Sequence, residues 1–412
     1  MPETLILSEQ GPEIQRLVKR VASARRVAVV TGAGISVNCG IPDFRSSSGL
    51  FRQIQQAHGD VVSKGRDLFD ASVVFRTAQT ASVFYAWMTH LRQQCAQAEP
   101  GVVHGFIRKL ADRGQLLRSY TQNIDGLERK AGLSVWDPHC TPDSADYVPW
   151  QHAHSIPLHG SMDRLTCQLC ASSVAFAAHP GRMAGDACAD CVQRSQEREQ
   201  SGRRALPAGK LRPTVVLYEE PHPHSEDIAR IIGHDTRALG RAKNDVLLVF
   251  GTTLKVPGCR QLVRQLAAAP NTTTVLVNNE PVCGRAWDGV VDYQIIGCVD
   301  DWCARVQRVW NAQTKITQWT TPRKSSTTQS DSKKNKIAVD TKKENAGGNA
   351  LLKAPSMQRK RRALDTANTN DGTDAKQPER KRRRAALPAR RSARIATRES
   401  LEHQQQSLSI CT

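Results

Sequence analysis

The sequence predicts an α/β domain with a doubly wound parallel sheet, interrupted by a small cysteine-containing module and followed by a disordered C-terminal tail. Two observations support this prediction. Short apolar runs alternate with segments of helical periodicity, which is the pattern of a parallel sheet covered on both faces. Composition then changes near residue 320, because aromatic residues and strand-like runs are nearly absent beyond it. The chain is therefore divided into a body, 1–320, and a tail, 321–412.

The apolar runs predict the strands of the sheet. The first run, in RVAVVTGAG, follows the helical segment Glu13–Ala24 and ends in a glycine turn. The later runs are Leu116–Tyr120, Thr214–Leu217, Val246–Phe250 and Thr274–Val277. Further helices are expected over Val73–Leu91 and Gly258–Ala268.

Polar or glycine clusters follow all but one of these runs. The clusters are Thr31–Gly34, Thr121–Asp125, Gly251–Thr253 and Asn278–Glu280. Ligands of open parallel sheets bind beyond the carboxyl ends of the strands, so the clusters are expected to converge on one site. The loop TGAGIS offers backbone N–H groups to a pyrophosphate, but its next glycine is Gly40, which departs from the GxGxxG pattern. Alone, this loop fits an ordinary strand–helix turn equally well.

Two CxxC pairs predict a metal site. Cys167 and Cys170 are separated by 17 residues from Cys188 and Cys191, the spacing of a tetrahedral site with four cysteine ligands. Four thiolates leave no open position, so one zinc ion would be structural and would stabilise an inserted module, 160–212. Two redox-active pairs are the alternative.

The tail is strongly basic. It holds 22 of the 58 Lys and Arg residues against 9 of the 39 Asp and Glu residues, which is +13 of the formal net charge of +19. The clusters Arg359–Arg362 and Arg380–Arg384 are typical of nuclear import and predict a nuclear location. Without interleaved aromatic residues, any nucleic-acid contact is expected to be nonspecific and sensitive to salt. A tail that only improves solubility is the alternative.

Hydropathy gives no sign of a membrane partner. No apolar stretch reaches 18 residues, and MPETLILSEQ at the start lacks the basic region and long apolar segment of a signal peptide. A protein inside the cell is expected.

The motifs occur together in an order that resembles the sirtuin family. They are GAGISVNCGIPDFRSSSGLF, YTQNIDGLE, PLHGS, the two CxxC pairs, GTTLKVPG and VLVNNE, and they extend over roughly residues 10–310. LRPTVVLYEEPHP and GTTLKVPG are similar to the nuclear fungal histone deacetylases of that family. The resemblance implies a Rossmann-like NAD domain and an NAD-dependent protein-lysine deacetylase. It also implies acetylated histone tails or core lysines as partners, and a role in chromatin silencing and genome stability.

The same resemblance implies an NAD site. Its expected members are Gly32, Ala33, Gly34, Ile35, Asp43, Phe44, Arg45, Gln122, Asn123, Ile124, Asp125, Gly251, Thr252, Thr253, Asn278, Asn279, Glu280 and Cys298. Thr253 replaces the serine usual in the family and keeps a hydroxyl group.

The resemblance also assigns the catalytic residues, His159 and Asn123. In the family mechanism the acyl oxygen attacks the ribose carbon that carries nicotinamide, and the histidine helps to deprotonate a ribose hydroxyl. An imidazole suits this step because its pKa lies near working pH. The products are nicotinamide, free lysine and O-acetyl-ADP-ribose. The other nearby histidines, His152, His154, His222 and His224, are expected to be structural.

Two segments resemble those that hold the substrate peptide as a strand between them. They are Arg212–Glu220 and Leu254–Gly258. Glu219 stands where the family has glycine, and its side chain either favours basic peptides or simply points into solvent. Two other functions remain open, a catalytically silent chromatin scaffold and a mono-ADP-ribosyltransferase. The presence of His159, Asn123 and Asp125 argues against the scaffold.

Overall fold

The computed structural model describes residues 2–9, 11–176, 183–282 and 284–320. The chain divides into two units, Met1–Thr327 and Thr328–Thr412, and all described residues lie in the first. The tail and its two basic clusters therefore lie outside the described residues. Among the helices that are described, none is both long and apolar enough to span a bilayer.

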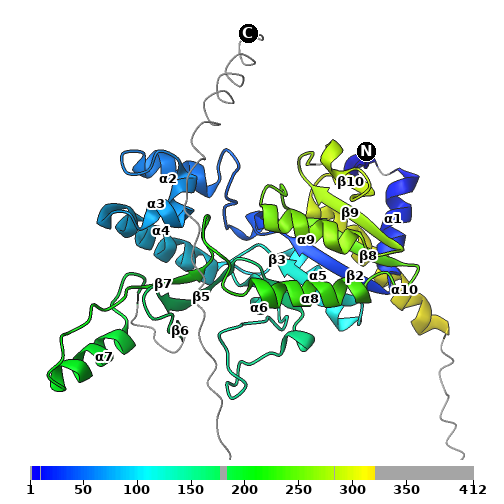
Figure 1. Cartoon of the computed structure of the whole chain (residues 1–412). Helices are drawn as coiled ribbons and strands as arrows, with labels where there is room; N and C mark the ends of the chain where they lie inside the picture. The colour runs from blue at the N-terminus through cyan, green and yellow to red at the C-terminus, as the bar shows by residue number, and fades with distance from the viewer. Residues whose placement is uncertain (1, 10, 177–182, 283, 321–412) are drawn as a thin grey trace, which may run out of the picture. The chain divides into compact units, whose positions relative to one another are not determined.

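The main sheet is parallel throughout (Figure 1). Its strands in the described residues are β1 (Glu3–Ile6), β2 (Arg26–Thr31), β3 (Leu116–Thr121), β4 (Ser155–Pro157), β8 (Asp245–Phe250), β9 (Thr272–Asn278) and β10 (Tyr293–Ile296). They lie in the order β1-β10-β9-β8-β2-β3-β4. The direction of winding reverses at β2, which pairs with β3 on one side and β8 on the other. This confirms the predicted doubly wound fold and puts its switch point at β2.

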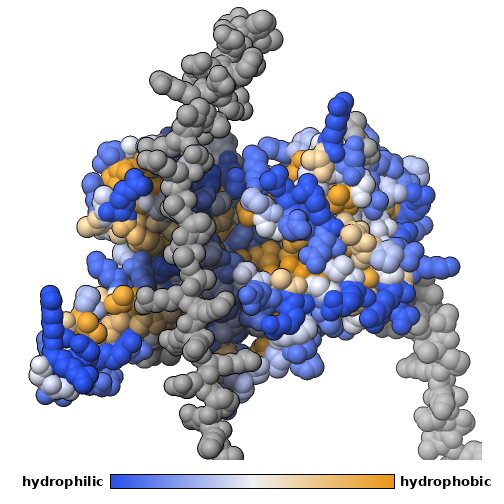
Figure 2. Space-filling view, in the orientation of Figure 1, coloured by the Kyte–Doolittle hydropathy of each residue, from blue (hydrophilic) through white to orange (hydrophobic). Residues whose placement is uncertain are grey.

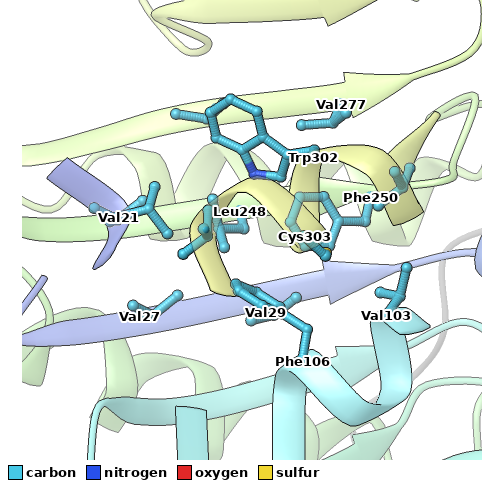
Figure 3. Close-up of a cluster of buried hydrophobic side chains, with 14 of the residues drawn as sticks. Val21, Val27, Val29, Val103, Phe106, Leu248, Phe250, Val277, Trp302 and Cys303 are labelled. Carbon is cyan, nitrogen blue, oxygen red and sulfur yellow. The ribbon is translucent and has the colours of Figure 1, made fainter. Parts of the chain in front are cut away.

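One face of the sheet is covered by α1 (Pro12–Ala22), α5 (Val102–Asp112) and α10 (Val299–Thr320). Figure 3 shows Val29 of β2 next to Phe106 of α5. Val27 of β2 and Trp302 of α10 belong to the same buried cluster. These four side chains are fully buried. Side chains on a strand alternate between its faces, so Ala28 and Val30 are directed to the opposite side.

The opposite face is covered by α8 (Ser225–Ala238) and α9 (Pro257–Ala267) (Figure 1). Their apolar residues pack against Ala28 and Val30 of β2 and against Leu247 and Val249 of β8. Burial on both faces explains why these strands are continuously apolar in sequence. The helices predicted at Glu13–Ala24 and Gly258–Ala268 are confirmed as α1 and α9.

A helical group lies between β2 and α5 in the chain and has its own core. It consists of α2 (Leu50–His58), α3 (Ala71–Val74) and α4 (Ala78–Gln97). The helix predicted over Val73–Leu91 is broken between α3 and α4, because the Thr77 hydroxyl accepts the N–H of Thr80 at 3.1 Å and starts a new helix. The short helix α6 (Leu127–Lys130) follows β3. Single 3₁₀ turns are Leu7–Glu9, Ala33–Ile35, Val37–Cys39, Gly65–Phe69, Trp150–His152 and Arg285–Trp287.

A second, antiparallel sheet carries the cysteine module. Its strands are β5 (Gly160–Cys167), β6 (Ser173–Ala175) and β7 (Leu211–Val215), and the module's helix is α7 (Ala189–Gln200). The prediction that Thr214–Leu217 is a strand of the parallel sheet is wrong, since β7 pairs only with β5 in the antiparallel sheet. The reason is visible in burial, which alternates along β7 as it does in a sheet with one covered face. Figure 2 shows that hydrophilic side chains cover the projecting end of α7.

Candidate active site

Four predicted polar clusters begin at one edge of the main sheet. β2, β3, β8 and β9 end at Thr31, Thr121, Phe250 and Asn278, and each predicted polar cluster begins at or directly after these ends. Parallel strands place all their carboxyl ends on the same edge. The expected convergence is therefore confirmed for the four clusters.

Two glycines let the loops after β2 and β8 touch. The N–H of Gly34 donates to the carbonyl of Gly251 at 2.9 Å. A Cβ added at Gly32 would lie 2.7 Å from the Cβ of Thr252, and one at Gly34 would lie 2.8 Å from the Cα of Gly251. Side chains at either position would force the loops apart. The glycines of TGAGIS are thus fixed by loop packing, while their backbone still lines the sheet edge.

A series of buried side-chain hydrogen bonds connects the loop after β2 to the loop after β3. Ser36 Oγ accepts from Asn123 Nδ2 at 3.1 Å and donates to Asp125 Oδ2 at 2.8 Å. Asp125 Oδ1 in turn accepts the N–H of Leu127 at 3.0 Å. Asn123 Oδ1 is buried and has no hydrogen-bond partner among the described residues, as is also true of Thr31 Oγ1. An unpaired acceptor and an unpaired hydroxyl at this edge fit a polar ligand such as NAD, because buried polar atoms are normally paired.

Ser36 was missing from the predicted site. Ser36 is 1% exposed, and its hydroxyl bonds both Asn123 and Asp125, so it is central to the geometry. The available signal was its place at the end of TGAGIS, where a hydroxyl follows directly on a glycine turn. The predicted contact of that loop was its backbone N–H groups, so the serine side chain was not included.

His159 lies beside this series of hydrogen bonds, two residues after β4. Its Nδ1 is 2.9 Å from the carbonyl oxygen of Gln122, which can only accept, so Nδ1 carries the proton. Burial lowers the pKa of His159 below its ordinary value, against a smaller raising effect of the Gln122 carbonyl. Neutral imidazole therefore dominates at pH 7, with the lone pair on Nε2. Such a group can accept a proton from a ligand at this edge.

Gln122 connects the histidine to the loop after β8. Its Nε2 donates to Thr252 Oγ1 at 2.9 Å and to the carbonyl of Thr31 at 3.2 Å. Gln122, just after β3, therefore contacts His159 through its main-chain carbonyl and Thr252 through its side-chain amide. Ile124, also a predicted site residue, packs into the core of the helical group.

Asp43, Phe44 and Arg45 lie on the loop that leads from β2 into the helical group. Asp43 Oδ1 accepts the N–H groups of Arg45 and Ser46, both at 2.7 Å. Phe44 packs edge-on against two phenylalanines of the helical group. Arg45 Nη2 donates to the hydroxyl of Tyr218, beyond the end of β7, at 2.9 Å. The structure thus connects this loop to the β7 segment.

The residues expected around the adenosine half lie at the ends of β8, β9 and β10. The N–H of Gly251 donates to Val277 at 3.3 Å, and that of Gly297 donates to Asn278 at 2.9 Å. These bonds join the three strand ends side by side. Asn279 and Glu280 are exposed, and Cys298 is half-buried at the start of α10. Thr253 is exposed next to Thr252.

The β7 segment passes directly by the histidine. The N–H of Val216 donates to the carbonyl of His159 at 3.0 Å. β7 is an edge strand, since the antiparallel sheet has the order β6-β5-β7. An edge strand offers main-chain groups that an added peptide strand can pair with. The main chain of Leu211 already bonds with Gly185 and Asp186, and that of Tyr218, beyond the end of β7, bonds with Phe69 and Ala71. A peptide strand could therefore be added between these two points, next to His159.

The remaining predicted histidines have structural surroundings. His222 Nε2 lies 3.0 Å from the carbonyl of Leu158, and His222 Nδ1 accepts the N–H of His224 at 3.1 Å. His154 Nδ1 lies 2.9 Å from the hydroxyl of Ser134. The rings of His139 and His224 meet edge to face at 5.1 Å. These contacts fix the insertion between α6 and β4 against the segment that follows β7.

The four predicted metal ligands come together in the small module. The sulfurs of Cys167 and Cys191 are 3.8 Å apart, those of Cys170 and Cys188 are 3.7 Å apart, and all four lie within 4.8 Å of one another. A tetrahedral zinc ion with bonds of about 2.3 Å separates its sulfur ligands by about 3.8 Å. The Cys167 sulfur also accepts the N–H of Leu169 at 3.4 Å. The cluster fits one structural zinc ion.

Comparison with known proteins agrees with this geometry. The Sir2 family profile matches residues 32–258. NAD-dependent histone deacetylase HST3 of Saccharomyces cerevisiae is 36% identical over 300 residues, which is 70% of this chain and 66% of that protein. NAD-dependent protein deacetylase hst4 of Schizosaccharomyces pombe is 37% identical over 271 residues, 65% of this chain and 62% of that protein. The chain thus spans less than two thirds of the length of these relatives.

Solved structures show the same fold. A crystal structure of a Sir2 homolog–NAD complex superposes with a TM-score of 0.53, at 20% identity, over 72% of this chain and 94% of that one. A Sir2 homologue in complex with ADP-ribose gives the same TM-score at 21% identity, over 73% of this chain and 98% of that one. The profile covers more than half of this sequence, and its motifs fall on the site described above. The chain therefore belongs to the Sir2 family, the sirtuins.

Proposed function

We propose that this chain is an NAD-dependent protein-lysine deacetylase that acts on acetylated histones. The observation that carries the proposal is the position and state of His159. Burial lowers its pKa and so favours the neutral imidazole, its Nδ1 proton is held by the carbonyl of Gln122, and it lies between the polar sheet edge and β7. A base that lies between the sheet edge, where the cofactor would bind, and β7, where the peptide would bind, suits acyl transfer from the peptide to the cofactor. The two yeast relatives, an NAD-dependent histone deacetylase and an NAD-dependent protein deacetylase, support this activity.

When bound, NAD supplies an electrophilic ribose carbon, from which nicotinamide leaves, and the ribose hydroxyls. In this proposal Nε2 of His159 takes a proton from a ribose hydroxyl. Asn123 turns its free Oδ1 toward the ligand because its Nδ2 donates to Ser36, whose hydroxyl in turn donates to Asp125. The other NAD contacts are proposed at Gly32–Ile35, Asp43–Arg45, Gln122–Asp125, Gly251–Thr253, Asn278–Glu280 and Cys298.

The decisive experiment follows the products of an acetylated histone peptide and NAD by mass spectrometry. We expect deacetylated peptide, nicotinamide and O-acetyl-ADP-ribose. Transfer of ADP-ribose to the peptide would indicate the ADP-ribosyltransferase, and the absence of NAD turnover would indicate the scaffold. Either result would overturn the proposal.

The role of His159 is tested by substitution. His159→Ala should lower the deacetylation rate by about 10²- to 10⁴-fold, because a positioned general base is lost, while the melting temperature and peptide binding change little. His152→Ala is the matched control, since His152 is exposed and lies before β4, in the insertion that follows α6. A His159→Ala enzyme that keeps more than about a tenth of the parent rate would contradict the assignment.

We further propose that residues 1–320 form the catalytic part, with the zinc module at 160–212, and that the tail directs the protein to the nucleus and its chromatin. The Sir2 family profile and the four clustered cysteines lie within residues 1–320, and the basic clusters follow them in the sequence. Removal of the residues after Trp319, in a fusion too large for passive nuclear entry, should abolish nuclear accumulation and leave deacetylation intact. Microscopy of the fusion and an assay of the purified protein measure the two effects. Full nuclear accumulation of the truncated fusion would refute this role of the tail.

A further inference from the structure

Four residues other than glycine have positive φ in the described part of the chain. They are Ala171, Glu219, Leu254 and Asn271. This left-handed region disfavours L side chains by roughly 1–2 kcal/mol, and such strain collects at functional sites. In three of the four, local contacts or the residue type account for the conformation, which leaves Glu219.

The other three are held by their surroundings or tolerate the strain. Ala171 closes the CxxC turn, since its N–H donates to the carbonyl of Cys167 at 3.0 Å. Leu254 is 2% exposed, and its N–H donates to Thr252 Oγ1 at 3.2 Å. Asn271 is of a residue type that tolerates this conformation.

Glu219 has no such compensation. It adopts φ +60°, its side chain is exposed, and no hydrogen bond or ion pair of that side chain occurs within the described residues. Glycine would adopt the same backbone without strain. Stability of the fold therefore does not explain a glutamate at this position.

Nearby arginines are already engaged with other groups. Arg212 forms an ion pair with Glu220, whose second oxygen accepts the N–H of Leu217 at 3.1 Å. Arg45 donates to the Tyr218 hydroxyl, and the guanidinium of Arg66 lies 4.3 Å from the centre of the Tyr218 ring. The Glu219 carboxylate is thus left for a cation from outside the chain.

The location of Glu219 suggests the source of that cation. It lies three residues beyond Val216, which pairs with His159, and directly after Tyr218, whose main chain bonds with Phe69 and Ala71. A peptide that adds to the edge of β7 and places an acetyl-lysine near His159 would bring its flanking residues past Glu219.

We propose that Glu219 is a specificity-determining residue that recognises a lysine or arginine flanking the acetyl-lysine of the substrate. The proposal rests on the deacetylase function proposed above and adds a substrate class to it. An exposed ion pair of this kind is modest in strength and is screened by salt. It therefore biases selection among substrates and is not required for turnover.

The test compares peptides that differ only in charge. Each contains one acetyl-lysine and carries either arginine or its neutral analogue citrulline at successive flanking positions. At low salt the parent enzyme should prefer the arginine peptide by about 2- to 5-fold in kcat/KM at one or more positions, and the preference should fall as salt is added. Glu219→Gln should abolish the preference while leaving kcat/KM for the citrulline peptide unchanged.

Glu226→Gln is the matched control, because Glu226 is exposed in the first turn of α8 and carries the same charge. The preference should survive in this variant. An unchanged preference in Glu219→Gln, or its equal loss in Glu226→Gln, would overturn the proposal.

A melting curve and a binding assay complete the test. Glu219→Gly should melt at or slightly above the parent temperature, and a clearly lower melting temperature would mean that the glutamate is structural and the proposal wrong. If the parent deacetylates neither peptide, the proposed function fails. Fluorescence anisotropy of the two peptides then still tests recognition, because tighter binding of the arginine peptide that depends on Glu219 supports it and equal binding refutes it.

Discussion

Replacement of Asp235 by alanine should destabilise the fold through one buried charge. Asp235 of α8 is fully buried and accepts from Arg118 Nε at 2.9 Å, from Arg118 Nη2 at 3.3 Å and from the hydroxyl of Tyr120 at 2.7 Å. Burial, together with the Asp235 carboxylate, raises the pKa of Tyr120 well above its ordinary value, so its hydroxyl is protonated and donates. Both partners lie on β3, the strand that ends at Thr121, next to Gln122.

The size of the effect follows from the charge that remains. Without Asp235 the Arg118 guanidinium stays buried with only the carbonyls of Trp150 and Ala153 as partners. Removal of one member of a buried ion pair typically costs about 3–5 kcal/mol. For a folded unit of about 300 residues, a loss of about 4 kcal/mol lowers the melting temperature by roughly 6 °C.

Urea denaturation of Asp235→Ala and its parent measures the change in the free energy of unfolding. The exposed pair of Arg108 and Asp112 is the control, and Asp112→Ala should cost about 0.5 kcal/mol or less. The double variant Arg118→Met with Asp235→Leu removes both charges and should recover about half of the loss. A loss below about 1 kcal/mol in Asp235→Ala would refute the reasoning.

Two other substitutions test the zinc cluster and a buried acid. Cys188→Ala should lose bound zinc, measured by atomic absorption, and melt at a clearly lower temperature. The control Cys140→Ser should keep the zinc and the parent melting temperature. Retained zinc in Cys188→Ala would exclude the closed site. Burial, with a smaller contribution from Asp125, raises the pKa of Glu128 to about 8, so the fold loses stability as pH rises from the unfolded value near 4.5 through 8. The glutamine of Glu128→Gln cannot ionise. The melting temperature of this variant should exceed that of the parent by an amount that grows up to about pH 8 and then stays constant. A difference that is the same at pH 5 and pH 9 would show that Glu128 is not protonated in the fold.

Much of the fold could be predicted from the sequence because the central strands are buried on both faces. β2, β3, β8 and β9 appear in sequence as apolar runs that end in polar clusters. The strands β1, β4 and β10 were missed, since they have only three or four residues and contain polar positions. β7 was assigned to the wrong sheet because its run was judged by composition, although Leu211–Val215 alternates in burial.

The site could be predicted as a set of residues but not as a network. Motifs identified Asn123, Asp125 and His159, and the structure brings all three to one edge. That Ser36 joins the first two, or that the Gln122 carbonyl selects the tautomer of His159, depends on contacts between segments about 40 to 90 residues apart. Such contacts leave no trace in local sequence pattern. The positive φ of Glu219 is equally invisible, since nothing in its neighbours requires it.

The pairing of β2 with β8 has a consequence for how the chain folds. Arg26 lies opposite Asp245, so the centre of the sheet joins segments more than 200 residues apart. Contacts of such separation slow folding, because a long loop must close before they form. The zinc cluster, in contrast, closes within residues 167–191 and can order its module early. During synthesis β2 and β3 are made well before β8, so their apolar side chains stay exposed until β8 can pair with β2. We expect newly made chains to depend on chaperones until β8 has emerged from the ribosome.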